Sequence, residues 1–452
     1  QFINNIKNKI SNKKITVLGA GISGQGASNL ATYLGAEVLL STNKKESIVN
    51  LISDKTNIEF SHSTKCLNSD LVVISPGINP NKLDIIKKIL NLGIPIISEI
   101  EFGYWFTKSP IISVTGSNGK STVVKIINDI FKCKYKKVLL GGNIGKSFCT
   151  NVINELESNS KSLIHILELS SFQLQRIITF KPILSCILNV QNDHLDRHGN
   201  FSNYFSDKMN IIKNADDSLP IVYNEDDIKL NNYCKKYKKI FPFSLKKKNA
   251  IYTNSKIVYS SNSNEPIINQ RDTKLIGSHN LQNILAAIQI AKIFCIKNED
   301  IKESLINFKP LKHRMERVET NNNILFINDS KGTNLLSTKS ALNSFNNKVI
   351  LILGGLTNEK IDTIELIKLV KKKNIIKIVC YGNVGKELFN TISEYREVIY
   401  KKEFSKAIHQ ALKYAKNNTT VLLSPGFKSF DQFNSFEERG DAFKKIIHNY
   451  YA

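Results

Sequence analysis

Residues 112–122 read ISVTGSNGKST, and this stretch decides how the rest of the chain is interpreted. A run of β-branched and apolar residues comes before the glycines, and an apolar helical pattern follows at residues 123–131. This order of strand, glycine turn and helix predicts a loop whose backbone N–H groups bind phosphate at a helix N-terminus. Lys120 is then placed to neutralise the phosphate charge, and the Ser121 hydroxyl to bind Mg²⁺.

The spacing of this loop is GxxGKS, which is shorter than the standard GxxxxGK followed by Ser or Thr. A glycine turn beside a surface lysine would give the same letters. The strand before the loop and the helix after it favour nucleotide binding over that alternative. We therefore predict that ATP binds at this loop.

Length and composition indicate a globular protein of several domains. The chain has 452 residues, of which 41% are hydrophobic and 23% charged, which is ordinary for such proteins. At about 150 residues per domain, three domains are expected. The apolar runs are shorter than the ~20 residues that cross a bilayer, and residues 1–14 lack the apolar core of a secretory signal. We expect a cytoplasmic protein that does not associate with membranes.

The formal net charge of +24 raises the question of nucleic-acid binding. The lysines are spread along the chain, and the densest runs, at residues 246–248 and 371–373, suit solvated loops or helix ends. Since no nucleic-acid-binding motif accompanies them, we expect a solvated basic surface and no nucleic-acid binding. Polyanionic substrates would also suit this charge. The 7 cysteines form no CxxC pair, so neither a zinc site nor a disulfide is predicted.

Short strands alternate with helices along the chain, which predicts an α/β fold built on parallel sheets. We place three domains at 1–98, 99–310 and 311–452. The first and third are expected to be Rossmann-like, and the central one is expected to be a phosphate-loop ATP-binding domain with a mostly parallel sheet. Predicted strands lie at residues 15–18, 37–40, 71–74, 94–97, 111–114, 162–167, 183–190, 221–223, 324–327, 349–353, 376–381 and 420–423, with hairpins and loops at 252–271.

A second glycine turn, GAGISG at residues 19–24, stands between a strand and a helix, which suits binding of a pyrophosphate. A dinucleotide-binding protein should also carry an Asp or Glu near the end of the second strand. Here residues 39–43 read LLSTN. The missing acid argues against NAD and is compatible with a nucleotide-sugar diphosphate at the same helix terminus.

Polar residues follow two predicted strands of the central domain. Glu168 ends one strand, and Asp193 and His194 follow the next, at the strand ends where ligands bind in open α/β sheets. Oxygen ligands suit Mg²⁺. From the residues alone, Glu168 as a helix cap and His194 as a core histidine are slightly favoured over metal ligands, and Lys208 is expected to be an exposed helix lysine.

In the third domain, KHR at residues 312–314 follows a linker, and NDSKGTN at residues 328–334 follows a strand. Arg314 and Lys331 would stabilise developing phosphate charge, and Asp329 would hold the ATP ribose. Asn, Asp, Ser and Gly also favour turns, so an Asx-turn in a surface loop is the alternative.

Together these stretches resemble the Mur ligase superfamily, whose phosphate loop reads GTNGKT or GTNGKST. ELSSFQL at residues 168–174 and NDHLDRH at residues 192–198 are similar to its metal-site motifs. SPGFKSFDQFNSFEERGDAF at residues 424–443 resembles the SPxxxSxDxFxxFExRGxxF signature of the members that add D-glutamate. The resemblance covers essentially the whole chain. It implies ligation of D-glutamate to UDP-N-acetylmuramoyl-L-alanine in peptidoglycan synthesis, with ATP and Mg²⁺ and through an acyl phosphate. We expect a monomer.

The resemblance also assigns roles to individual residues. Catalysis falls to Lys120, Lys208, His194, Arg314 and Lys331. The metal ligands are Ser121, Glu168, His194 and Lys208, the last of them as a carbamate. ATP is bound by Gly116, Asn118, Gly119, Lys120, Ser121, Thr122, Asn280, Asn283, Arg314 and Asp329. The other substrates are bound by Ile22, Ser23, Ser75, Gly77, Asn143, Ser170, Thr333, Lys360, Ser429 and Phe436.

Two features depart from the family pattern. Family members often carry an acid where Ser41 stands, and the cation expected soon after Gly355 is represented by Lys360 at the end of a longer loop. One alternative function is a folylpolyglutamate synthetase-like glutamate ligase. The N-terminal glycine turn argues against it, because that family lacks a domain ahead of its ATP-binding domain. The other alternative is an NAD- or nucleic-acid-binding regulator.

Overall fold

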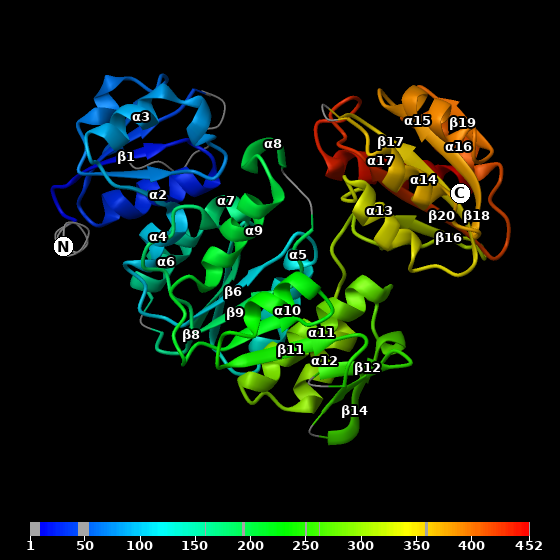
Figure 1. Ribbon diagram of the computed structural model, residues 1–452, viewed down its shortest axis with the longest axis horizontal. Helices are drawn as coiled ribbons and strands as arrows, with labels where there is room; N and C mark the ends of the chain where they lie inside the picture. Colours follow the sequence, from blue (N-terminus) through cyan, green and yellow to red (C-terminus); the bar gives the residue numbers. More distant parts are fainter. Residues whose placement is uncertain are drawn as a thin grey trace. The chain divides into compact units, whose positions relative to one another are not determined.

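The computed structural model describes residues 10–43, 54–158, 160–191, 195–248, 251–261, 263–357 and 360–451. The chain divides into two compact units (Figure 1). The N-terminal unit comprises Gln1–Asn269 with Gln282–Ile306, and the C-terminal unit comprises Gln270–Leu281 with Asn307–Ala452. The described residues form two sheets in the N-terminal unit and a third in the C-terminal unit.

The first sheet is parallel and pairs its strands in the order β3 (Thr56–Glu59), β2 (Glu37–Ser41), β1 (Lys14–Leu18), β4 (Leu71–Ile74) and β5 (Ile96–Ser98). The segments that join or follow these strands form α2 (Ile22–Tyr33), η2 (Thr64–Leu67), η3 (Pro80–Lys82), α3 (Asp84–Asn91) and α4 (Glu99–Tyr104). Successive side chains of a strand point to opposite faces of the sheet. In β1, Val17 therefore packs with Leu30 of α2, whereas Leu18 packs with Ile86 of α3.

The central sheet pairs its strands in the order β14 (Ser263–Asn269), β13 (Ile257–Ser260), β12 (Ile251–Asn254), β11 (Ile240–Ser244), β10 (Ile221–Asn224), β9 (Leu184–Ile187), β6 (Ile111–Thr115), β8 (Leu163–Glu168) and β7 (Lys137–Gly142). The pairs from β7 to β12 are parallel, and β12, β13 and β14 pair antiparallel. Its helices are α5 (Lys120–Phe131), α6 (Phe148–Leu156), α7 (Ser171–Leu174), α8 (Leu195–His198), α9 (Phe201–Met209), η4 (Asn210–Ile212) and α10 (Ile228–Cys234). Because β6 lies between β8 and β9, the loops after these strands gather at one edge of the sheet.

The third sheet pairs its strands in the order β15 (Glu316–Val318), β16 (Leu325–Asn328), β20 (Thr419–Gly426), β17 (Lys348–Gly354), β18 (Ile375–Tyr381) and β19 (Val398–Lys401), with β15 antiparallel and the other pairs parallel. The segment before it in sequence forms η5 (Gln270–Asp272), α11 (Ser278–Ile293) and α12 (Asn298–Asn307). Its own helices are α13 (Leu335–Leu342), α14 (Thr363–Val370), α15 (Gly385–Ile392), α16 (Phe404–Leu412) and α17 (Phe436–Tyr451). Leu351 of β17 packs with Leu366 of α14, whereas Ile352 packs with Phe404 of α16, so both faces of this sheet are covered.

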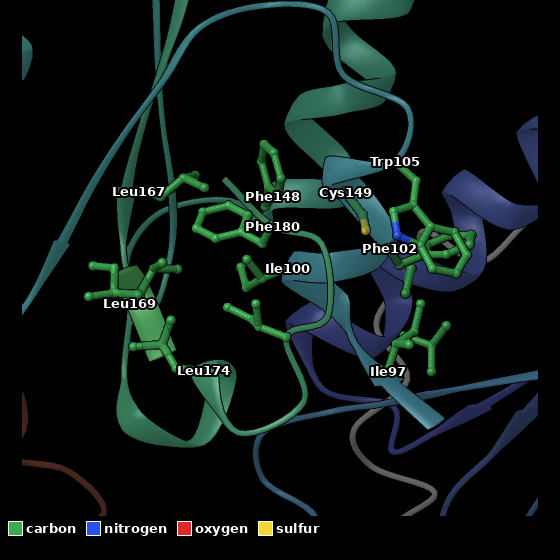
Figure 2. Close-up of a cluster of buried hydrophobic side chains, with 14 of the residues drawn as sticks. Ile97, Ile100, Phe102, Trp105, Phe148, Cys149, Leu167, Leu169, Leu174 and Phe180 are labelled. Carbon is green, nitrogen blue, oxygen red and sulfur yellow. The ribbon is translucent and has the colours of Figure 1, made fainter. Parts of the chain in front are cut away.

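A continuous apolar core joins the first two sheets. Figure 2 shows part of it, where Ile97 of β5 and Phe102 of α4 belong to the same buried cluster as Phe148 of α6 and Leu167 of β8. Glu101 of α4 is buried at the same place, and its carboxylate accepts hydrogen bonds from the backbone N–H groups of residues 178, 179 and 180. Residues 97–105 thus belong to a core shared by the two sheets, which explains why these sheets form one compact unit.

The predicted α/β class with a mostly parallel central sheet is confirmed, whereas the three domain boundaries stay a prediction. Strands β3, β7, β11, β15 and β19 were not among the predicted strands, and β9 is shorter than the predicted 183–190. The cysteines are free thiols. None of the helices in the described residues combines the length and apolar character needed to cross a membrane.

Candidate active site

The predicted phosphate-binding loop connects β6 to α5, which begins at Lys120. Gly119 caps this helix with φ of +92°, a conformation that favours glycine. A Cβ on Gly119 would lie 2.3 Å from Asn283 Oδ1, so the predicted ATP-binding residue Asn283 lies beside the loop. Ser121 and Thr122 are buried in the first turn of α5. The backbone N–H groups of this turn have no partner within the helix and are the groups that bind a phosphate.

Two lysines converge on this loop. Lys120 Nζ donates hydrogen bonds to the carbonyl oxygens of Gly116, at 2.7 Å, and Ser117, at 3.0 Å. Lys208 Nζ, from α9, donates to the same Gly116 oxygen at 2.9 Å and lies 4.7 Å from the centre of the Tyr204 ring. Lys208 is 2% exposed, so the expectation from composition that it is an exposed helix lysine is wrong. Two positive charges are therefore held at the N-terminus of α5, where anions are stabilised.

The segment after β9 holds the loop in shape. Asn118 N donates to Asn189 Oδ1 at 2.8 Å, and Asn189 Nδ2 donates back to Asn118 O at 3.0 Å. Ser117 Oγ and Tyr204 Oη form a further hydrogen bond of 2.9 Å. Asn189 and Tyr204 were not predicted as site residues, because nothing in their local sequence distinguishes them from other polar and aromatic residues.

Glu168 lies at the end of β8, at the same edge of the central sheet. Asn143 Nδ2 donates to Glu168 Oε1 at 2.9 Å, and Asn143 N donates to the Glu168 carbonyl at 2.8 Å. Glu168 is 2% exposed, and among the described residues its Oε2 has no hydrogen-bond partner. A buried carboxylate oxygen without a donor fits a cation ligand, and oxygen ligands suit Mg²⁺. The alternative of Glu168 as a helix cap is wrong, because the Ser170 side chain caps α7.

The remaining predicted metal ligands are described only in part. His194 lies outside the described residues, as does Asp193. Within the described ranges, no three His, Cys, Asp or Glu side chains gather in a group that could hold a metal ion. A Mg²⁺ site at Glu168 therefore stays a prediction, supported by the buried oxygen of that carboxylate.

A hydrogen-bonded chain that the sequence did not predict ties the Glu168 loop to the helix that carries Lys208. Ser171 Oγ and His198 Nε2 are 3.0 Å apart, and His198 Nδ1 lies 2.8 Å from Asp207 Oδ2. Ser171 and His198 are both buried. Since Asp207 immediately precedes Lys208, this chain fixes α9 relative to the first turn of α7.

The glycine turn at residues 19–24 connects β1 to α2 in the first sheet. A Cβ on Gly24 would lie 1.7 Å from Gly19 O, so only glycine fits there. Ser75 Oγ donates to the same Gly19 oxygen at 2.9 Å, which joins two of the predicted substrate-binding segments. Ile22 is 69% exposed in the first turn of α2, and no described atom lies within 4 Å of the position of a Cβ on Gly77. Ser23, also in this turn, is half-buried.

The C-terminal unit brings Arg314, Asp329 and Lys331 together. Met315 N donates to Asp329 Oδ1 at 3.2 Å, and Lys331 N donates to the His313 carbonyl at 3.0 Å. Arg314 stands between two residues with positive φ, His313 at 62° and Met315 at 48°. Such backbone strain is concentrated at functional sites. Asp329 is 5% exposed, so the surface loop of that alternative is wrong. The Asx-turn itself is present, because Ser330 N donates to Asn328 Oδ1 at 3.2 Å, but it is buried.

Asp329 has an unusual protonation equilibrium. Burial raises the pKa of Asp329 to about 6, although a hydrogen bond from Ser424 and the nearby Arg314 guanidinium favour the ionised form. The Ser424 hydroxyl donates to Asp329 Oδ2 at 2.7 Å. Carboxyl groups with raised pKa values are concentrated at functional sites, and Asp329 is the predicted ribose ligand.

Segments 328–334 and 424–443 meet in the same unit. Lys331 Nζ lies 5.4 Å from the centre of the Phe436 ring, and Thr333 N donates to the Lys331 carbonyl at 2.9 Å. Ser429 is 2% exposed in the turn between β20 and α17. Lys360 is exposed, and residues 358 and 359 beside it lie outside the described residues. The structure thus brings Lys331 and Phe436 together, whereas the role of Lys360 stays a prediction.

Asn280, predicted to bind ATP, belongs to the C-terminal unit in the first turns of α11. It is 3% exposed, and its Nδ2 donates to the Ile276 carbonyl at 2.8 Å.

Arg439 organises this region and was not selected as a site residue. Its guanidinium is fully buried and donates to the Ser330 carbonyl at 2.8 Å, the Phe427 carbonyl at 3.0 Å and Tyr381 Oη at 3.1 Å. These bonds connect the loops after β16 and β20 to the end of β18. The RG pair within residues 424–443 was the available signal, but the letters alone do not distinguish a buried arginine from an exposed one.

Comparisons with known proteins agree with this arrangement. The Mur ligase middle domain matches residues 114–291, and the Mur ligase glutamate ligase domain matches residues 313–427. The chain is 34% identical to the UDP-N-acetylmuramoylalanine–D-glutamate ligase of Christiangramia forsetii over 97% of this chain and 99% of that protein. It is 38% identical to the ligase of the same name from Bacteroides thetaiotaomicron, over 96% of this chain and 99% of that protein.

Solved structures give the same fold. MurF ligase from Thermotoga maritima, in complex with ADP, has a TM-score of 0.62 at 16% identity and covers 98% of this chain and 97% of that one. UDP-N-acetylmuramate-alanine ligase from the same organism has a TM-score of 0.60 at 17% identity, over 97% of this chain and 100% of that one. From the domain matches and the full-length relatives, the chain belongs to the Mur ligase family.

Proposed function

We propose that this chain joins D-glutamate to UDP-N-acetylmuramoyl-L-alanine in peptidoglycan synthesis, with ATP converted to ADP and phosphate. The observation that carries the proposal is the similarity to two ligases named for this reaction over 97% and 96% of the chain. The side chains at residues 116–122, 314–331 and 424–443 supply the chemistry that such a reaction needs.

Two displacements would make up the reaction. A carboxylate oxygen of UDP-N-acetylmuramoyl-L-alanine attacks the γ-phosphorus of ATP, and the bond to the β-phosphate oxygen breaks to release ADP. The neutral amine of D-glutamate then attacks the acyl carbon, and phosphate leaves with the electrons of the carbon–oxygen bond. The product is an amide, and the amine proton passes to solvent.

Lys120 and the first turn of α5 would stabilise the charge that builds on the transferred phosphoryl group. The Lys120 ammonium is already held at the loop by the carbonyls of Gly116 and Ser117, so only a short movement of a flexible side chain is required. Arg314 and Lys331 are proposed to act on the same group, and Asp329 to bind the ATP ribose. The contact between Met315 N and Asp329 supports this joint role.

Glu168, Ser121 and His194 are the residues that would hold Mg²⁺, which when bound offsets the charge between two anionic reactants. We propose that Lys208 carries a carbamate, formed when its neutral amine attacks carbon dioxide and loses a proton. The burial of Lys208 against Gly116 supports a position close to the phosphates. After exposure to ¹³C-bicarbonate, a carbamate carbon signal that is absent from Lys208→Arg would support this modification; its absence from the wild-type protein would exclude it.

The D-glutamate would bind in the C-terminal unit. Ser429 and Thr333 are proposed to bind a carboxylate, Phe436 to line the pocket, and Lys360 to pair with the side-chain carboxylate. The approach of Lys331 Nζ to the Phe436 ring supports a pocket that combines an aromatic wall with positive charge.

Phosphate release from ATP tests the proposal. The purified chain is supplied with UDP-N-acetylmuramoyl-L-alanine and one amino acid at a time. We expect release with D-glutamate and none with L-glutamate, L-alanine, L-lysine or diaminopimelate. Turnover that requires one of those other amino acids would reject the assignment. Turnover of a folate with L-glutamate, without turnover of the UDP substrate, would instead establish the folylpolyglutamate synthetase-like alternative.

We also propose that the enzyme is a cytoplasmic monomer. Sedimentation of the purified chain at micromolar concentration should give a single species of about the 51.0 kDa chain mass. A species of twice that mass would contradict the monomer.

A further inference from the structure

The end of β2 lacks the acid that a nucleotide-binding sheet of this kind usually carries, and the structure shows a carboxylate reaching the same point from β3. β2 and β3 are parallel and in register, with Ser41 opposite Glu59. Gly19 N, in the glycine turn, donates to the Ser41 carbonyl at 2.8 Å. Ser41 and Glu59 therefore lie at the sheet edge where the nucleoside of a bound diphosphate is expected.

Glu59 is held by protein donors. Ser41 Oγ donates to Glu59 Oε1 at 2.8 Å, Ser63 N donates to the same oxygen at 3.1 Å, and Ser63 Oγ donates to Oε2 at 2.6 Å. Cys66 Sγ is a further donor at 3.1 Å from Oε1. Burial disfavours the carboxylate, but these hydrogen bonds outweigh it, so the pKa of Glu59 lies below its ordinary value. Glu59 is therefore ionised at neutral pH and can only accept hydrogen bonds.

This ionised carboxylate decides the tautomer of the neighbouring histidine. Ser41 Oγ has one proton, and that proton is directed to Glu59. His62 Nδ1 lies 2.8 Å from the same Ser41 oxygen. Because Ser41 has no second proton to donate, Nδ1 must carry the hydrogen of this bond. Burial also lowers the pKa of His62, so the ring is neutral and its Nε2 is an unprotonated acceptor.

His62 Nε2 is the ring nitrogen that Ser41 does not contact. The side chain is half-buried, and within the part of the chain that the structure describes no protein group hydrogen-bonds to Nε2. A fixed acceptor at this edge of the sheet favours a planar base that presents an N–H donor to it. Uracil has a donor at N3, whereas cytosine has an acceptor there and would repel Nε2.

We propose that His62 Nε2 accepts the N3–H of the uracil base, and that Ser41 and Glu59 are positioning residues that fix His62 in the accepting tautomer. The inference rests on the proposed function, since it names how that function selects a uridine nucleotide. Glu59 replaces, from the neighbouring strand, the acid absent at Ser41, and acts through two intervening groups rather than on the ligand.

The first test measures the tautomer itself. In ¹⁵N-histidine-labelled full-length protein, long-range proton–nitrogen correlation distinguishes a protonated from an unprotonated ring nitrogen, and His62→Gln assigns the signal. We expect Nδ1–H in the wild-type protein. Ser41→Ala removes the hydroxyl that accepts the hydrogen bond from His62 Nδ1, so the Nε2–H tautomer should become populated. A wild-type ring protonated at Nε2 would overturn the inference.

The second test measures binding of free UDP and CDP by calorimetry. We expect the wild-type protein to bind UDP more tightly than CDP. In Ser41→Ala the ratio of UDP to CDP affinity should fall about tenfold, the effect expected from losing one hydrogen bond. Glu59→Gln should retain it, because the amide oxygen can stay at the Oε1 position to accept from Ser63 N and Ser41, while its NH₂ donates to Ser63 Oγ. Glu37→Gln, the same change at the exposed start of β2, is the matched control and should leave the preference unchanged.

Three further results would contradict the inference: no UDP binding by the wild-type protein, an equal loss of preference in Ser41→Ala and Glu37→Gln, or a changed tautomer with an unchanged UDP-to-CDP ratio. Because the probes are UDP and CDP alone, these outcomes do not depend on ligation. Failure of phosphate release with D-glutamate, together with an intact UDP preference, would reject the proposed function and leave this inference standing.

Discussion

Lys120 and Lys208 lie on different helices, yet both side chains donate to the carbonyl oxygen of Gly116, at 2.7 and 2.9 Å. Two ammonium groups thus converge on the loop that begins α5. A phosphate bound at this helix N-terminus would lie close to both of them. The relationship explains why a lysine far along the chain belongs to the phosphate loop.

Replacing Lys120 by Ala should lower kcat/KM by roughly 10²–10³-fold, the usual effect of losing a group that stabilises transition-state charge. Steady-state phosphate release measures this change. The melting temperature should stay nearly constant, because the Lys120 bonds go to loop carbonyls and not to the core. Lys132→Ala, at the exposed end of the same helix, is the control and should retain wild-type activity. Equal losses in both variants would contradict a specific role for Lys120.

Glu168→Gln should raise the Mg²⁺ concentration required for half-maximal activity by about tenfold or more. The buried Oε2, which accepts no hydrogen bond from the described part of the chain, would be replaced by an amide nitrogen. A titration of activity against Mg²⁺ measures this shift, and Mn²⁺ binding followed by electron paramagnetic resonance gives a readout independent of turnover. Glu157→Gln, at an exposed position, should change neither. An unaltered metal requirement in Glu168→Gln would remove this residue from the metal site.

The pKa of Asp329 predicts a pH dependence of stability. The folded-state pKa of about 6 lies above the ordinary aspartate pKa of 3.8. The stabilising contribution of the protonated form is therefore complete below about pH 4 and is lost as the pH rises through 6. The difference of about two pH units corresponds to roughly 3 kcal/mol.

Asp329→Asn cannot ionise, so its stability should not fall as the pH rises through 6. The variant should therefore be more stable than the wild-type protein at pH 7.5, and it should bind ATP more weakly. Urea denaturation at pH 4.5 and 7.5 measures the effect. The amide can keep the Met315 N bond through its oxygen and donate to Ser424. Asp272→Asn, on the exposed surface of the same unit, should show the wild-type pH dependence. If the stability of Asp329→Asn showed the wild-type pH dependence as well, ionisation of Asp329 would not be its cause.

Phe436→Ala should raise the KM for D-glutamate by about tenfold, which corresponds to about 1.4 kcal/mol of lost contact with the aromatic wall. The KM for ATP should change little. Phe430→Ala removes a phenylalanine of the same segment that is 63% exposed, and it should behave like the wild-type protein. A rise in the KM for ATP and not for D-glutamate would place Phe436 outside the amino-acid pocket.

Arg439→Lys should destabilise the C-terminal unit by about 3 kcal/mol or more, because an ammonium cannot serve the Ser330, Phe427 and Tyr381 acceptors together. Scanning calorimetry would record this as a lower transition temperature. Arg317→Lys, at a side chain 59% exposed, should be nearly neutral. Comparable stability of the two variants would contradict the organising role of Arg439.

Local patterns in the sequence determined the strands that flank the glycine turns and the position of Lys120 at a helix start. Each of these features depends on residues close together in the chain. A β-branched run, a glycine and an apolar helical period act on the same few backbone dihedral angles. The same reasoning identified β17 and β20, whose buried apolar runs are strong. It missed β3, because TNIE at residues 56–59 has weak alternation and little apolar character.

Side-chain partners depend instead on how the strands are ordered, which no short stretch of sequence specifies. Glu59 meets Ser41 only because β3 pairs with β2, and Lys208 meets Gly116 only because α9 packs beside the phosphate loop. The sequence by itself thus determined the fold class, the phosphate loop and the motifs that indicate the reaction. Only the tertiary structure decided that Lys208 is buried and that the Glu59 carboxylate reaches Ser41, since burial and hydrogen bonding are set by contacts between residues far apart in the chain.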